Sequence, residues 1–210
     1  MMRDALCLRC PAKLNFGLEV VGRRSDGYHE IRTIFQAIDL ADDLDIEPAS
    51  SGLRLRVQGA GVPDGAENLV LQAAELLRSS TGVQAGARLA LRKRIPPGAG
   101  LGGGSSDAAV TLMGLDELWG TRLGPQGLDA LAGRLGADVP YFLRGGACLG
   151  LGRGDKLVAL EWDLTAARVI VVCPQESLST AQVYADWDAG LTSSSNHSKL
   201  RRFLASALAG

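Results

Sequence analysis

The sequence lacks the features that mark several large classes of protein. Its formal net charge is −1 over 210 residues, so no strong overall field attracts nucleic acid or an acidic membrane surface. No apolar run has the length of a membrane span. The N-terminus has neither the apolar core nor the cleavage site of a signal peptide. We therefore predict a cytoplasmic protein that has no nucleic-acid partner and no membrane partner.

Histidine and cysteine are also scarce, with 2 and 4 residues respectively. Cys7 and Cys10 form a C-x-x-C pair, but a zinc site would need a second close pair or neighbouring histidines. The pair falls in an expected first strand, whereas a thioredoxin-type redox motif precedes a helix. The sequence therefore favours structural thiols over a zinc or redox site.

Glycine is abundant, and it is concentrated between Pro96 and Asp107. Five glycines fall within the seven residues 98–104, and Ser105 and Ser106 follow them. Glycine lets backbone N–H groups approach a ligand closely, and a helix N-terminus adds free donors and a partial positive charge. The segment is therefore predicted to bind an anion such as phosphate. A flexible linker is the alternative, but linkers are not normally held between a strand and a helix.

Spacing distinguishes between the known phosphate motifs. A Walker A loop needs Gly-Lys-Ser/Thr, whereas Gly104 precedes Ser105 with no lysine. A dinucleotide fingerprint matches by letters at Gly98, Gly100 and Gly103, but no acid about twenty residues further on supports it. The downstream H-R-D and D-F-G motifs of a protein kinase are absent.

Hydrophobic periodicity predicts a mixed α/β chain. Asn68 is expected to cap a helix, and the apolar run 169–173 is expected to form a buried strand. The basic runs 92–94 and 199–202 are typical of solvated faces. Strands are predicted over 6–10, 17–21, 31–40, 44–47, 53–57, 89–93, 147–151 and 169–173, and helices over 68–77, 108–119, 129–135, 181–188 and 199–208.

The pattern Pro-Pro-Gly-x-Gly-Leu-Gly-Gly-Gly-Ser-Ser-Asp-Ala-Ala from Pro96 resembles the second motif of the GHMP kinases, a family of small-molecule kinases. The segments 11–15, 24–29 and 135–140 are similar to further motifs of that family in the same order. The resemblance covers about residues 7–190. It implies an α/β (α+β) two-domain GHMP-kinase fold. The ATP-binding and catalytic domain, of the ribosomal-protein-S5-domain-2-like type, would span 1–155, and a partial C-terminal domain would span 156–210.

The resemblance also implies the cofactors, ATP and Mg²⁺. Either Ser105 or Ser106 is the expected Mg²⁺ ligand, because the ion prefers oxygen donors. Asp138 is implied to be the base that removes the proton from the acceptor hydroxyl, and Lys13 is implied to lie beside it. Taken alone, Asp138 would be an ordinary turn residue and Lys13 a solvated charge. The expected ATP-binding residues are Pro96, Pro97, Gly98, Ala99, Gly100, Leu101, Gly102, Gly103, Gly104, Ser105 and Ser106.

The implied small-molecule substrate carries a cytosine. Tyr28 would stack on one face of the base and Tyr184 on the other, while His29 would bond its edge. Asn15 and Thr180 match polar positions near the acceptor end. The expected reaction is transfer of the γ-phosphoryl of ATP to the 2-hydroxyl of 4-diphosphocytidyl-2-C-methyl-D-erythritol. That reaction is a step of non-mevalonate isoprenoid biosynthesis.

The sequence departs from the family pattern near its C-terminus. GHMP kinases carry a third glycine-rich motif there, and no such motif follows residue 155. We therefore expect a second domain that is incomplete and an activity that is weak or absent. Two alternatives stay open: a truncated pseudo-kinase that binds nucleotide without turnover, and a GHMP kinase for another small alcohol. The sequence does not indicate the oligomeric state.

Overall fold

A computed structural model describes residues 5–59, 61–162, 164, 166–174 and 179–190. The chain divides into two compact units: unit 1 comprises Met1–Leu14 and Ala37–Gly145, and unit 2 comprises Asn15–Gln36 and Gly146–Gly210. Two long strands, β1 (Leu6–Arg23) and β2 (His29–Ala49), are paired with each other and contribute residues to both units. No helix within the described ranges combines the length and the apolarity that crossing a bilayer would require.

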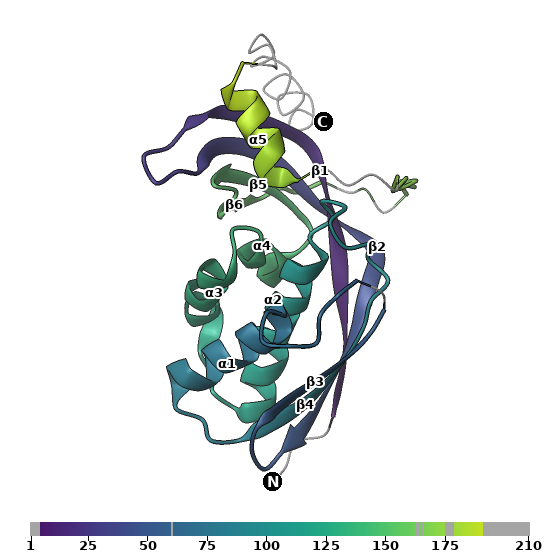
Figure 1. The fold of residues 1–210 in the computed structure, drawn as a ribbon, viewed down its shortest axis with the longest axis vertical. Coiled ribbons are helices and arrows are strands. Elements are labelled where there is room, and N and C mark those ends of the chain that lie inside the picture. The colour runs from purple at the N-terminus through teal and green to yellow at the C-terminus, as the bar shows by residue number, and fades with distance from the viewer. Residues whose placement is uncertain (1–4, 60, 163, 165, 175–178, 191–210) are drawn as a thin grey trace. The chain divides into compact units, whose positions relative to one another are not determined.

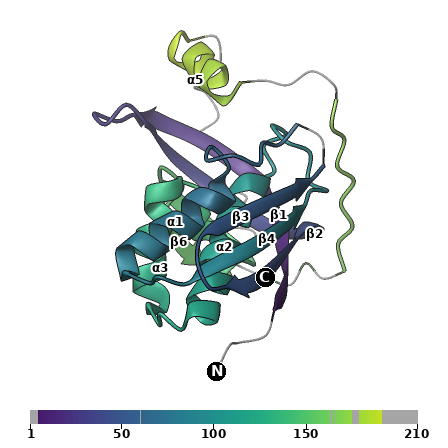
Figure 2. The same cartoon turned by 60° about the horizontal axis from the view of Figure 1, so that its bottom comes forward.

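In the described part of unit 1, β2 is followed by two strands and four helices: β3 (Leu53–Gln58), α1 (Leu69–Thr81), β4 (Gly86–Arg92), α2 (Gly103–Trp119), α3 (Gly124–Leu135) and α4 (Val139–Arg144). Residues 43–49 of β2 pair antiparallel with β4, and β4 pairs parallel with β3. Parallel neighbours need a crossover, and α1 supplies it. Figure 1 shows α1 to α4 on one side of these strands, and Figure 2 shows β3 and β4 side by side.

The helix predicted over 68–77 is confirmed as α1. The side chain of Asn68 caps it, because its Oδ1 accepts a hydrogen bond from Val70 N at 2.9 Å. The residues that share one face at helical spacing are the buried ones, namely Val70, Ala73, Ala74 and Leu77. The apolar face that α1 contributes to the core of unit 1 therefore follows from the helical spacing of its apolar residues.

The central helix α2 begins five residues before its predicted start, because Gly103 and Gly104 belong to its first turn. It packs against α1, α3 and α4. A Cβ at Gly114 would lie 2.6 Å from Ile46 Cδ1 and 2.7 Å from Leu8 Cδ1. Glycine at this position therefore allows α2 to approach the strands, which fixes the end of the glycine loop against the sheet.

Unit 2 contains the remaining parts of β1 and β2. Residues 31–36 of β2 pair antiparallel with β5, and β5 forms a hairpin with β6. Short strands were predicted over 6–10 and 17–21, and over 31–40 and 44–47, but each pair is one continuous strand. The elements that follow β2 in unit 2 are β5 (Ala147–Gly152), β6 (Lys156–Ala159) and α5 (Thr180–Asp188).

The prediction of a buried strand over 169–173 is wrong. The segment has no strand assignment, and Ile170 and Val172 are 91% and 82% exposed. A buried strand needs neighbours that complete its hydrogen bonds, and none of the described strands pairs with this segment. The helix predicted over 199–208 lies outside the described residues.

Candidate active site

The glycine loop of unit 1 adopts a left-handed backbone at alternate residues. Gly98, Gly100 and Gly102 have φ values of 72°, 71° and 72°, a conformation that is costly for residues with a Cβ. The loop borders a pocket of about 270 Å³. The pocket is lined by Val62, Pro63, Glu67, Asn68, Leu69, Lys93 and Ile95, by the loop residues Pro96 to Gly104, and by Asp107.

Gly102 joins the loop to α2 and is the N-cap residue of that helix. A Cβ at this position would lie 2.7 Å from Phe142 Cζ and 3.1 Å from Lys13 Cγ, so only glycine fits without movement. Gly102 has no side chain to accept from the first N–H groups of α2, and these donors remain available. Free N–H donors at a helix N-terminus are the groups that an anion would need.

Lys13 and Asp138 lie beside each other in unit 1. Lys13 Nζ is 3.5 Å from Asp138 Oδ2, and the two side chains are 7% and 36% exposed. Lys13 N also donates to Leu101 O at 2.9 Å. This backbone bond fixes β1 to the glycine loop, so the ion pair of Lys13 and Asp138 is held next to that loop.

A buried charge cluster supports the loop. Lys93 Nζ lies 2.5 Å from Asp42 Oδ2 and 2.7 Å from Asp107 Oδ2. Asp42 Oδ1 also accepts from the backbone N of Arg94 and of Ile95, at 2.5 Å and 2.9 Å. The prediction that this basic run is a solvated face is wrong for Lys93, which is buried and joins β2 to α2.

Burial raises the pKa of Asp107 to about 6, although Lys93 opposes that shift. Burial alone would lower the pKa of Lys93, but Asp107 and Asp42 raise it overall. A buried ammonium with two carboxylate partners is already neutralised. Lys93 therefore acts first as a structural support for the loop rather than as a free cation for phosphate.

The two serines differ in their environment. Ser105 is half-buried, whereas Ser106 is fully buried and its Oγ has no hydrogen-bond partner in the described part of the chain. Within that part, no group of three or more His, Cys, Asp or Glu side chains could hold a metal ion. One hydroxyl suits Mg²⁺ only together with phosphate oxygens, because Mg²⁺ requires about six oxygen ligands.

Unit 2 contains the aromatic residues of the expected cytosine site. The rings of His29 and Tyr184 stack with centroids 4.4 Å apart, and Trp187 meets His29 edge-on at 5.6 Å. His29 Nε2 lies 2.9 Å from Asp188 Oδ1. The structure therefore stacks Tyr184 on His29 and engages one ring nitrogen of His29 with a carboxylate.

Tyr28 lies outside that stack. Its ring is covered by Arg153, whose guanidinium carbon is 4.8 Å from the ring centroid. Asn15 Nδ2 donates to Thr33 Oγ1 at 2.6 Å, and Thr180 is the exposed first residue of α5. The structure thus brings His29 and Tyr184 together.

Sequence reasoning missed Asp42, Lys93 and Asp107 as parts of the site. One signal was present: Leu89 and Leu91 are buried and lie two residues apart in β4, so Lys93, two residues further on, continues their inward face. A charged residue on a buried face needs a partner. No comparable sequence signal indicated Arg153.

Known proteins resemble this chain in both sequence and fold. Residues 68–146 match the family described as GHMP kinases N terminal domain. A homoserine kinase from Cytophaga hutchinsonii has the same fold, with a TM-score of 0.58 at 22% identity over 90% of this chain and 65% of that chain. Residues 68–146 therefore carry the N-terminal domain of the GHMP kinases.

Within this family the chain is similar to one kind of kinase. It is 49% identical over 181 residues to a 4-diphosphocytidyl-2-C-methyl-D-erythritol kinase from Pelotomaculum thermopropionicum, covering 86% of this chain and 63% of that relative. A crystal structure of 4-(cytidine 5'-diphospho)-2C-methyl-D-erythritol kinase has a TM-score of 0.66 at 49% identity, covering 74% of this chain and 55% of that chain. The chain thus spans less than two thirds of the length of these relatives.

Proposed function

We propose that this chain carries the catalytic residues of an ATP-dependent kinase that phosphorylates the 2-hydroxyl of 4-diphosphocytidyl-2-C-methyl-D-erythritol. That reaction would place it in isoprenoid biosynthesis. The observation that carries the proposal is the 3.5 Å contact between Lys13 and Asp138, together with the backbone bond from Lys13 to Leu101 of the glycine loop. The names of the relatives support the choice of substrate.

The glycine loop would hold the phosphates of ATP. Backbone N–H groups of Gly98 to Gly104 and the N-terminus of α2 supply donors and positive potential. Phosphoryl transfer depends mainly on positioning and on charge neutralisation. The loop therefore has the properties that the nucleotide requires.

Asp138 and Lys13 would act on the acceptor. As the hydroxyl oxygen attacks the γ-phosphorus, its proton passes to Asp138 Oδ, a new O–P bond forms, and the bond to the bridging oxygen of ADP breaks. Lys13 beside it would stabilise negative charge on the transferring group. Both residues are fixed by the fold, so the cost of ordering them is met before substrate binds.

Mg²⁺, when bound with ATP, would neutralise charge on the phosphates and orient them. Ser105 or Ser106 would contribute a hydroxyl oxygen. The phosphate oxygens of the nucleotide would supply most of the other non-water ligands.

Unit 2 would recognise the cytidine end of the substrate. Tyr28 offers an exposed ring for stacking, and His29 could bond the edge of the base through Nδ1, because Nε2 is paired with Asp188. Tyr184 is engaged by His29 on one face. Asn15 and Thr180 would contact the acceptor end of the substrate.

Turnover with ATP and a panel of acceptor alcohols tests the proposal. We expect ADP release with 4-diphosphocytidyl-2-C-methyl-D-erythritol and no comparable rate with homoserine or mevalonate. Asp138→Asn should reduce kcat by about 10²- to 10⁴-fold, with ATP binding retained. Preference for another alcohol would refute the substrate assignment, and ATP binding without turnover would support the pseudo-kinase alternative.

A further inference from the structure

The exposed loop before β2 is held in one conformation by its own charges. Arg24 contacts both carboxylate oxygens of Asp26 through Nε, at 3.1 and 3.0 Å, and binds Glu30 Oε2 through Nη1 at 2.7 Å. Asp26 Oδ1 in turn accepts from Tyr28 N at 3.2 Å. Arg24 N also donates to Tyr28 O at 2.8 Å. The backbone of Tyr28 is therefore fixed on both its donor and its acceptor side.

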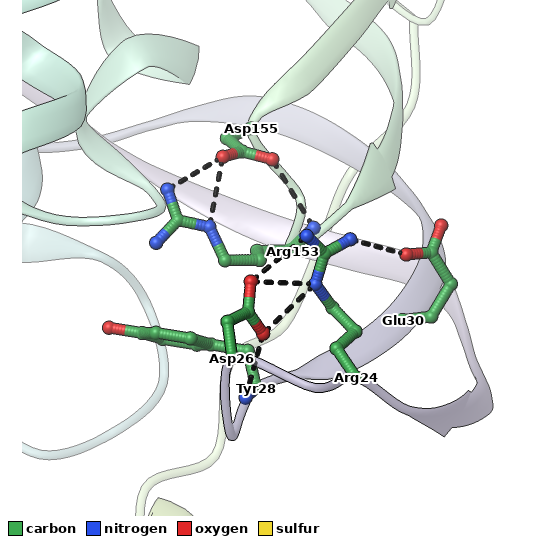
Figure 3. Close-up of polar contacts among 6 residues, drawn as sticks. All are labelled: Arg24, Asp26, Tyr28, Glu30, Arg153 and Asp155. Carbon is green, nitrogen blue, oxygen red and sulfur yellow. Dashed lines mark hydrogen bonds and ion pairs between the residues drawn. The ribbon is translucent and has the colours of Figure 1, made fainter.

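A second arginine holds the side chain of Tyr28. Arg153, in the turn between β5 and β6, contacts Asp155 Oδ2 through Nε at 3.0 Å and through Nη2 at 2.8 Å. Its guanidinium carbon lies 4.8 Å from the centroid of the Tyr28 ring. Figure 3 shows Arg153 between the carboxylate of Asp155 and the ring of Tyr28. The cation is thus aligned with the ring before any ligand binds.

The charges of this cluster support the arrangement. Partial burial would raise the pKa of Asp155, but hydrogen bonds from Arg153 lower it overall. The hydrogen bonds from Arg24 lower the pKa of Asp26. Both carboxylates therefore stay ionised at neutral pH, and both arginines remain tethered.

We propose that Arg153, held by Asp155, is a positioning residue that fixes the ring of Tyr28, so that a pyrimidine base stacks on the remaining exposed part of that ring. Tyr28 is 52% exposed even with Arg153 against it. A planar cation over one face prevents ring rotation and leaves the opposite face for a planar ligand. The inference rests on the proposed function, because it assumes that this unit recognises a cytidine.

Tyr184 does not cover the exposed part of the Tyr28 ring in this structure. Its ring stacks on His29 at 4.4 Å rather than facing Tyr28. The order of stacking that follows is Arg153, Tyr28 and then the base. Preorganised rings bind a planar ligand with less loss of side-chain freedom.

The test measures cytidine diphosphate binding by calorimetry, and KM and kcat with the full acceptor. Arg153→Gln should raise Kd for cytidine diphosphate and KM for the acceptor by about two- to fivefold, with kcat and KM for ATP unchanged. Arg153→Lys should recover part of the loss, because the cation is kept without the two-point contact to Asp155. Arg88→Gln, which breaks an exposed pair with Glu47 in unit 1, is the matched control and should change neither constant.

A double-variant cycle separates this role from a general structural one. Tyr28→Leu removes the stacking ring, and Arg153→Gln should then cause no further loss of cytidine diphosphate affinity. Equal losses from Arg153→Gln with and without Tyr28 would overturn the proposal. An unchanged Kd for Arg153→Gln in a chain that binds cytidine diphosphate would also overturn it. If the native chain fails to bind cytidine diphosphate at all, the proposed substrate is wrong, and this result is distinct from either of the others.

Discussion

The two units hold their candidate functional residues by different physical means. In unit 1, Lys93, Asp42 and Asp107 are buried side chains in direct contact. In unit 2, Arg24 and Asp26 form a pair that is open to solvent. Buried ions are costly to separate, whereas exposed pairs contribute little and exchange readily with water. The difference predicts that the ion pairs of the buried cluster in unit 1 contribute more to the free energy of unfolding than the Arg24–Asp26 pair in unit 2.

The strongest test of this contrast removes one buried cation. Lys93→Met leaves two carboxylates without their partner, and we expect a loss of about 3–5 kcal/mol in the free energy of unfolding. Arg24→Met, in unit 2, should reduce stability far less. Urea unfolding of both variants measures the difference, and similar losses would show that burial does not distinguish the two clusters.

An intermediate effect is expected at two glycines with left-handed backbones. Gly102→Ala forces a Cβ to within 2.7 Å of Phe142 Cζ, at a φ of 72°. It should lose about 1–2 kcal/mol of stability from the backbone alone, and about 1–3 kcal/mol more from the contact. Gly27→Ala, in unit 2, has a φ of 85° with no atom nearby and should show the backbone cost only.

Urea unfolding measures both glycine variants, and nucleotide titration adds a functional reading. Gly102→Ala should weaken ATP binding because the loop must move, while Gly27→Ala should leave ATP affinity unchanged. If the two variants lose equal stability, the close contact of Gly102 carries no energetic weight.

The smallest expected loss of stability tests whether burial, rather than membership of unit 1, makes an ion pair strong. Arg88 and Glu47 both belong to unit 1, but their side chains are 60% and 55% exposed. Arg88→Gln should therefore change the free energy of unfolding by less than about 1 kcal/mol, unlike Lys93→Met in the same unit. A large loss would mean that unit 1 as a whole, rather than burial, makes its ion pairs strong.

Much of unit 1 could be predicted from the sequence because its signals are local. Helical spacing and the Asn68 cap predicted α1, and the glycine run predicted an anion site at the start of a helix. The proximity of Lys13 and Asp138 came only from family resemblance, since no local pattern connects residues so far apart in the chain.

The errors have a common physical origin. The basic run was predicted to be a solvated face from its composition alone, although Lys93 directly follows β4 and continues the alternation of the buried Leu89 and Leu91. The run 169–173 was predicted as a buried strand because its side chains are apolar, but burial requires a partner that composition does not supply. Arg153 could not be found, because a cation over a ring depends on two turns that meet only in the fold.

Unit 2 is assembled from segments that the ribosome makes at different times. Residues 15–36 leave it before the whole of 37–145, and their partner strand β5 follows only afterwards. Until then the edge of β2 that binds β5 has no hydrogen-bond partner, and open edges promote association with other chains. The first half of β2 therefore keeps one open edge until β5 has been synthesised, and this is the interval in which we expect association with other chains.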